Sequence, residues 1–184
     1  MIQIEPGLKT VMDGLNAIGL PTHEEVGAAG FIKGVRIEAG ELYVDPGASV
    51  SSLLHEAGHI AGVPKRFRHY VGQDLTAALA RMWDEIEHED PEGPLYRALI
   101  QCSDPEATAW AYAFGTHLGL HPHLIILDSE YSNEGEHVRS CIMARAYLGI
   151  NGLAAAGFCA SSPMVAKFRN QPLYPKLAFW TQDL

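Results

Sequence analysis

The sequence predicts a mainly helical α+β fold with a small antiparallel sheet near its N-terminus, formed by a single domain that covers residues 1–184. Three observations support this class. Apolar residues recur at helical spacing over most of the chain. One early stretch has the strand–turn–strand pattern of a hairpin. Glycine and proline separate these segments, and no repeat or long linker divides the 184 residues, which suffice for one core.

The first part of the chain predicts one helix and the hairpin. Residues 7–18 place apolar side chains on one helical face, and glycine and proline follow directly. Residues 31–38 and 41–45 are strand-like, and the Ala-Gly pair between them suits a two-residue turn. An Asp-Pro-Gly sequence then ends the second strand.

The rest of the chain predicts helices joined by short turns. The second helix has an apolar face, a serine-rich start that offers caps, and a glycine and a proline at its end. The predicted helices cover residues 50–61, 74–87, 95–102, 103–119 and 132–149. Prolines interrupt residues 170–180, which are expected to lie extended across the surface.

Composition excludes several classes of function. The chain has 13 Lys and Arg against 22 Asp and Glu, a net charge of −9, which disfavours binding to nucleic acid or anionic membranes. No apolar run reaches the ~18 residues that span a bilayer. The start lacks the pattern of a secretory signal, and the three cysteines form no CxxC pair. We therefore expect reduced thiols and a cytoplasmic protein.

The stretch LLHEAGHIAG, residues 53–62, carries the strongest functional signal. His55 and His59 are four residues apart, so one helical face presents both imidazoles to one ion. Zinc accepts such nitrogen ligands, and a catalytic zinc site keeps one position for water. Glu56 lies beside the pair, where it can act as general base. The pattern predicts a zinc-dependent hydrolase; two imidazoles would also accept nickel, cobalt or iron.

Two neighbouring features fit a cleft for a peptide. Gly58 lies between the histidines and allows another backbone to come close. The strand at 41–45 comes just before the motif, and as an edge strand it would pair with an extended peptide. The expected partner is therefore a peptide or protein substrate.

A third ligand must come from elsewhere in the chain. The metzincin pattern fails because Lys65 stands where its third histidine would be, and a charged lysine has no lone pair to offer. Glu106 is the best candidate, in an alanine-rich helix that could approach closely. Its alternative role is in a capping box with Ser103. Other candidate ligands are His121, His123, Asp128 and His137.

These motifs resemble those of the zincin metallopeptidases, in particular the gluzincins, which combine HExxH with a distant glutamate. The sequences LYVDPGASVSSLLHEAGHIAG and PEATAWAYAF are similar to the arrangement in ImmA/IrrE-type peptidases. The resemblance implies a zincin-like fold and Zn²⁺ as the cofactor. It implies His55, His59 and Glu106 as metal ligands and Glu56 as the general base.

Peptide hydrolysis also needs a donor for the tetrahedral oxyanion. His137 and Tyr131, near the start of a late helix, are the candidates for this role. The alternative to a metallopeptidase is a non-catalytic protein of zincin-like fold that binds zinc only to join its helices, or that serves protein interaction. Glu56 favours catalysis, since a structural zinc site needs no base between its histidines.

Overall fold

The structure is a computed structural model that describes residues 6–184. It is mainly helical with one small sheet, so the α+β prediction is confirmed. The α-helices are α1 (Pro6–Ala17), α2 (Val50–Gly62), α3 (Leu75–Glu85), α4 (Pro94–Ile100), α5 (Asp104–His117), α6 (Pro122–Ile125), α7 (Gly135–Met143), α8 (Leu148–Ala155) and α9 (Pro163–Arg169). The strands are β1 (Thr22–Glu24), β2 (Val35–Glu38) and β3 (Glu41–Val44), and two 3₁₀ turns are η1 (Lys65–Tyr70) and η2 (Tyr131–Asn133).

The sheet has the order β1-β3-β2 and is mixed rather than antiparallel. The predicted hairpin is present, with Val35 opposite Val44 and a turn at Ala39 and Gly40, both at positive φ. The first strand, β1, pairs in parallel with β3 and was not predicted, because three residues are too few to show alternation. The prediction that residues 41–45 form an edge strand is wrong: β3 is central and paired on both sides.

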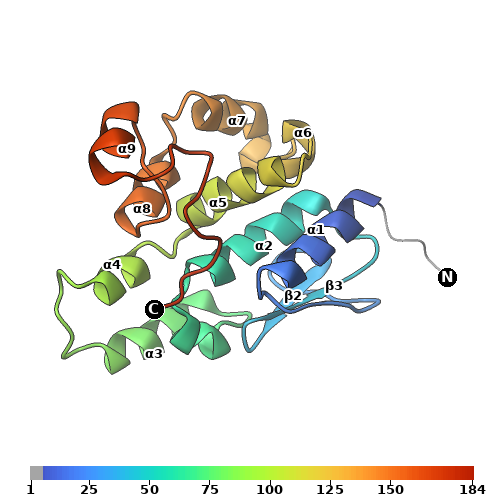
Figure 1. Cartoon of the computed structure of the whole chain (residues 1–184). Coiled ribbons are helices and arrows are strands. Elements are labelled where there is room, and N and C mark those ends of the chain that lie inside the picture. The colour runs from blue at the N-terminus through green and yellow to red at the C-terminus, as the bar shows by residue number, and fades with distance from the viewer. Residues whose placement is uncertain (1–5) are drawn as a thin grey trace.

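Helix α2 lies at the centre of the fold, between α1 and the sheet on one side and α5 on the other (Figure 1). The Ser49 hydroxyl caps it by accepting a hydrogen bond from Ser52 N at 2.9 Å. Leu53, Leu54 and Ile60 are fully buried in the main hydrophobic cluster. Packing on several sides therefore fixes the position of α2, and with it the histidine pair.

The late helical segment is divided, where the sequence predicted one helix over 132–149. Helix α7 ends at Met143, Arg145 adopts a left-handed conformation with φ 56°, and α8 begins at Leu148. Leu148, which the sequence placed in that helix, is 68% exposed at the start of α8. Arginine gives no sequence signal for a left-handed residue, which is why the break was not predicted.

The C-terminal segment, residues 170–184, runs extended over the helices as a strap and reaches α2 (Figure 1). It is extended, as the sequence predicted, but some of its residues are also buried in the core or bonded to the helices. The Tyr174 side chain is buried and its hydroxyl donates to the Ala109 carbonyl of α5 at 2.8 Å. Gln182 N donates to the Ala61 carbonyl of α2 at 3.0 Å. The strap therefore ties α2 and α5 together from outside.

None of the described helices is both long enough and apolar enough to cross a membrane. Cys102, Cys141 and Cys159 are free thiols.

Candidate metal centre

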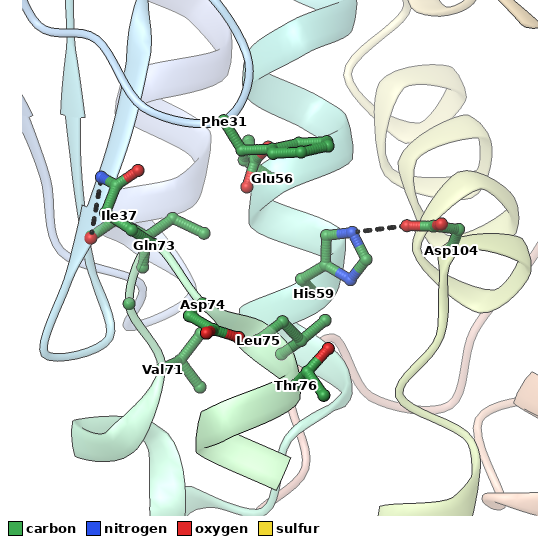
Figure 2. A pocket seen from close by; sticks show the side chains of 11 residues that line it. Phe31, Ile37, Glu56, His59, Val71, Gln73, Asp74, Leu75, Thr76 and Asp104 are labelled. Carbon is green, nitrogen blue, oxygen red and sulfur yellow. Dashed lines mark hydrogen bonds and ion pairs between the residues drawn. The ribbon is translucent and has the colours of Figure 1, made fainter.

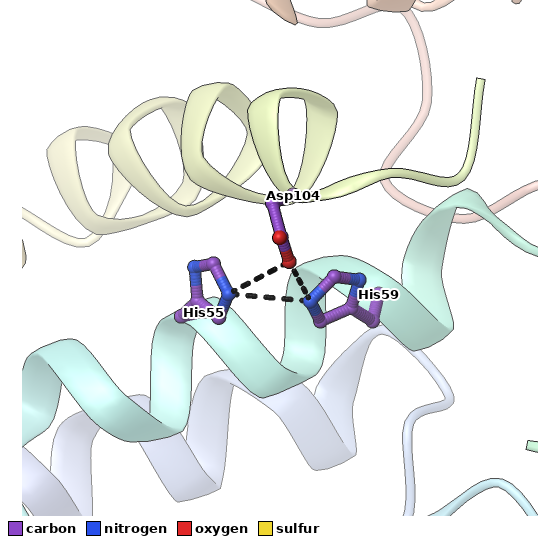
Figure 3. Close-up of side chains that lie close together, drawn as sticks. All are labelled: His55, His59 and Asp104. Atoms are coloured by element: carbon purple, nitrogen blue, oxygen red, sulfur yellow. Dashed lines mark hydrogen bonds and ion pairs between the residues drawn. The ribbon is translucent and has the colours of Figure 1, made fainter. Parts of the chain in front are cut away.

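His55 and His59 project from the same face of α2 toward the start of α5 (Figure 3). Their Nε2 atoms lie 3.2 Å apart and their rings are nearly perpendicular. His59 is buried, with 7% of its surface exposed, while His55 is partly accessible. The four-residue spacing therefore does what the sequence predicted: it turns two imidazole nitrogens to one point.

Asp104, the first residue of α5, completes a three-residue cluster. Its Oδ1 atom lies 3.2 Å from His59 Nε2 and 3.7 Å from His55 Nε2. The neighbouring imidazoles of His55 and His59 hold the pKa of the Asp104 carboxyl well below its usual range. The carboxylate remains open to solvent on its outer side, with 80% of the side chain exposed. Among the described residues, this is the one group with metal-ligand spacing.

Glu106, the third ligand that the sequence predicted, is not in this cluster. Its side chain is buried, accepts a hydrogen bond from the Ser103 hydroxyl, and lies against Gly152 of α8. Residues two apart on a helix point roughly 200° apart, so Asp104 and Glu106 face different neighbours. The Glu106 side chain folds back toward Ser103, as in the capping-box alternative. Its partner, however, is the serine hydroxyl and not a backbone N–H.

The close approach of α5 to α2 explains how an aspartate, with its short side chain, reaches the histidines. A Cβ atom on Gly58 would lie 2.5 Å from the Ala107 carbonyl oxygen, inside the range of a severe clash. Only glycine permits this contact, as the sequence predicted. Because Ala107 follows Asp104 by one helical turn, the contact sets the start of α5 directly over His55 and His59.

The three ligand atoms form a triangle with sides of 3.2, 3.2 and 3.7 Å. In a tetrahedral zinc site with bonds of about 2.0–2.1 Å, neighbouring ligand atoms are separated by about 3.3–3.4 Å. The triangle therefore has nearly the dimensions of one face of such a tetrahedron. The residue types, two imidazoles and a carboxylate, are those that zinc accepts. These residues fit a bound zinc ion.

The second ring nitrogen of His59, Nδ1, is buried with no hydrogen-bond partner among the described residues. A histidine that binds a metal through Nε2 usually donates its Nδ1–H to an acceptor, which fixes the ring. Here packing supplies that restraint, since the His59 side chain is 9% exposed.

Glu56 lies beside the histidines and faces a cavity that also exposes His59 and Asp104 (Figure 2). Its side chain is 8% exposed, and no described residue donates a hydrogen bond to it. Burial raises the pKa of the Glu56 carboxyl, and the neighbouring histidines act in the opposite direction. The Glu56 carboxylate is thus largely removed from solvent and accepts no hydrogen bond from the described residues.

Two cavities meet at the cluster. One, of ≈ 480 Å³, lies between α2, β2 and the start of α3, and contains Glu56 and His59. The other, of ≈ 460 Å³, lies on the His55 side and reaches Tyr131. Asp104 and Phe31 line both cavities, and the Phe31 ring stands over Glu56 in Figure 2. These two residues therefore form a common border of the two cavities.

Tyr131, one of the two predicted oxyanion donors, lines the second cavity together with His55 and Asp104. Its hydroxyl lies 2.9 Å from Thr108 Oγ1, and burial raises its pKa to about 12. Tyr147 lines the same cavity and was not predicted. Its pKa is also raised by burial, so both phenols keep their protons at neutral pH. The Thr108 hydroxyl donates to the Asp104 carbonyl at 2.8 Å, so the Tyr131 hydroxyl donates to Thr108 Oγ1 and must turn from it to donate into the cavity.

The remaining predicted candidates lie elsewhere. His137 is exposed on α7, where its Nε2 lies 3.5 Å from Cys141 Sγ, and it lines neither cavity at the cluster. The alternative ligands His123 and Asp128 lie 3.6 Å apart, and Asp128 pairs with Arg139. His121 stacks on His123. These residues are not brought to His55 and His59.

The chain matches no protein-family model, no curated protein and no solved structure. The feature of the chain that points to a function is the arrangement of His55, His59, Asp104 and Glu56.

Proposed function

We propose that the protein is a zinc-dependent metallopeptidase of zincin-like fold, in which His55, His59 and Asp104 hold the ion and Glu56 is the general base. The single observation that carries this proposal is the triangle of ligand atoms, with sides of 3.2, 3.2 and 3.7 Å, beside an unpaired buried carboxylate. When bound there, zinc would polarise a scissile carbonyl and lower the pKa of a coordinated water to about 7.

Glu56 supports catalysis over a purely structural metal. A raised pKa brings a carboxylate closer to the operating pH, where it can accept a proton from water and return it to a leaving amine. The acceptor is not engaged by other groups, and it opens into the ≈ 480 Å³ cavity. The exposed outer side of Asp104 leaves the cluster accessible from solvent. A closed four-ligand site would have neither feature.

Tyr131 and Tyr147 are the groups placed to donate to a developing oxyanion. Both line the cavity on the His55 side, and both hydroxyls remain protonated at neutral pH. The contact between Tyr131 and Thr108 Oγ1 holds the first phenol in place. We therefore assign this role to the tyrosines and not to His137, which lies outside both cavities.

The lining of the two cavities disfavours a substrate whose free C-terminal carboxylate would have to lie in them. Neither cavity contains a lysine or arginine, whereas Asp74 and Glu130 line one each in addition to Asp104. A free C-terminal carboxylate of a substrate would find no counter-ion there and would meet like charge. Apolar side chains, including Phe31 and Leu75, are available to contact substrate side chains.

The free thiols support a further part of the proposal, a cytoplasmic location. Cys102 and Cys159 are buried and unpaired, as is usual in a reducing compartment.

The test uses the full chain loaded with one equivalent of zinc and a peptide library in two forms, with free and with blocked termini. Mass spectrometry identifies the cleaved bonds. We expect cleavage of internal bonds at similar rates in both forms. Glu56→Gln should lower the rate by at least about 10²-fold while zinc binding is retained. Glu136→Gln, an exposed substitution on α7, is the matched control and should cleave as the wild type does.

Three results would count against the proposal. Equal cleavage by the wild type and Glu56→Gln would remove the assigned base. Cleavage confined to peptides with free C-termini would contradict the argument from cavity charge. Stoichiometric zinc without cleavage of any library member would favour the alternative, a non-catalytic zinc-binding protein.

A further inference from the structure

A cavity of ≈ 860 Å³, separate from the metal cluster, lies where the C-terminal strap crosses α5 and the turn after α7. Its volume is within the range of ~300–1,000 Å³ usual for small-molecule sites. It shares no lining residue with the two cavities at the cluster. Its lining is Ala113, Thr116, His117, Arg145, Leu173, Tyr174, Pro175, Lys176, Leu177 and Trp180.

The charge of this cavity is opposite to that of the chain. The protein carries a net charge of −9, yet no aspartate or glutamate lines the cavity, while Arg145, Lys176 and His117 do. Neither the Arg145 guanidinium nor the Lys176 ammonium forms an ion pair or hydrogen bond with the described residues. Both cations are therefore available to an anion from solution.

The backbone at Arg145 adds a second, independent observation. The residue follows α7 in a left-handed conformation, with φ 56°, and Ala146 N donates to the Cys141 carbonyl at 2.8 Å. Glycine or asparagine is the usual residue at this position of a helix end, because a larger side chain is strained there. An arginine in this strained conformation, with its side chain lining a cavity, points to a role in binding. The rival explanation is that the cation stabilises the helix C-terminus.

One wall of the cavity is aromatic and is formed by Trp180. The Trp180 ring lies 4.8 Å from the His117 ring and 5.0 Å from Phe114, which fixes the indole between α5 and the strap. Leu173, Pro175 and Leu177 continue the apolar surface. An inorganic ion would use the cations and leave this surface exposed, whereas a ligand with an apolar body would cover it.

We propose that this cavity binds a small organic anion, a carboxylate or phosphate carried on a planar apolar body. The oxyanion lies between Arg145 and Lys176, where the guanidinium can bind it through two N–H groups. The planar body packs on Trp180. The site is independent of the metal cluster, and its existence does not depend on peptidase activity.

Calorimetric titration of the full chain with four probes tests this proposal. The probes are phenyl phosphate, 3-phenylpropionate, inorganic phosphate and benzyl alcohol. We expect the two aromatic anions to bind at least roughly tenfold more tightly than inorganic phosphate, which lacks the body, and than benzyl alcohol, which lacks the charge. The relative affinity of the two aromatic anions distinguishes a phosphate site from a carboxylate site. NMR shifts of the Trp180 indole N–H locate the binding.

Variants separate binding from folding. Arg145→Gly and Lys176→Gln should each weaken binding of the aromatic anions by roughly tenfold, whereas Lys167→Gln on α9, outside the cavity, should not. Because glycine relieves the left-handed strain, the melting temperature of Arg145→Gly should not fall. A lower melting temperature with unchanged binding would favour the helix-end explanation and overturn the proposal. Aromatic anions that bind no more tightly than benzyl alcohol would also overturn it.

Discussion

Gly58 of α2 and Ala107 of α5 are in backbone contact: a Cβ atom on Gly58 would lie 2.5 Å from the Ala107 carbonyl oxygen. This contact places the two central helices close enough for Asp104 to reach His55 and His59. A single glycine in the motif helix therefore determines the geometry of the candidate metal centre.

Gly58→Ala should destabilise the protein by about 1–3 kcal/mol, since the helices must separate to admit the methyl group. The same separation moves Asp104 away from the histidines and should weaken zinc binding. Urea unfolding and a zinc titration measure the two effects. Gly62→Ala, in the same helix, is the matched control, because its Cβ would meet nothing nearer than 3.7 Å. Equal stability of the two variants would show that the α2–α5 contact is not tight.

The two carboxylates at the start of α5 should have separable roles. Glu106 is buried and bonded to Ser103, so Glu106→Ala should cost about 1–3 kcal/mol in the free energy of unfolding and leave zinc affinity unchanged. Asp104 is largely exposed, so Asp104→Ala should cost the metal-free protein less stability than Glu106→Ala does, while zinc affinity is lost. Chemical denaturation without metal and zinc titration give these values. The reverse pattern would restore Glu106 as the ligand.

Phe31 should contribute to substrate binding and not to stability. Its side chain is 93% exposed, yet it lines both cavities at the cluster. Phe31→Ala should raise KM for a library-derived peptide severalfold and leave the melting temperature unchanged. Phe168→Ala, which removes an 88% exposed ring from α9, is the control and should alter neither. A fall in kcat with unchanged KM would place Phe31 in the chemical step instead.

The ion pair between Asp128 and Arg139 should make stability depend on pH. Arg139 is buried, donates to the Ile126 carbonyl at 2.6 Å, and lowers the pKa of Asp128 through a hydrogen bond. A lowered folded-state pKa stabilises the protein above the unfolded value of about 3.9, and this contribution is lost as pH falls through the folded-state pKa.

Asp128→Asn should therefore be less stable than the wild type at neutral pH, and the difference should vanish at acidic pH. Thermal unfolding of both proteins from pH 7 down to about pH 2 covers the interval in which Asp128 becomes protonated. A difference that stays constant over this range would show that the charge of Asp128 is not what stabilises Arg139.

Local sequence signals predicted the features that depend on neighbouring residues. The spacing of His55 and His59, the hairpin turn at Ala39 and Gly40, and the close approach at Gly58 all follow from short-range geometry, and the structure shows each of them. These are features in which residue type and position alone fix the outcome.

The features that were not predicted depend on how elements meet. Whether Asp104 or Glu106 faces α2 is decided by the rotation of α5 about its axis, which is set by packing against both α2 and α8. The break before α8 uses an arginine in a conformation usual for glycine. Tyr147, which lines the cavity, lies in that break, directly before α8.

The most direct test of the metal centre is equilibrium dialysis against zinc followed by elemental analysis of the full chain. We expect one zinc per wild-type chain, at least about tenfold weaker binding in His59→Ala and Asp104→Asn, and unchanged binding in Glu106→Gln. A wild type that binds no zinc, or variants of His59 and Asp104 that bind it as the wild type does, would contradict the proposed metal centre.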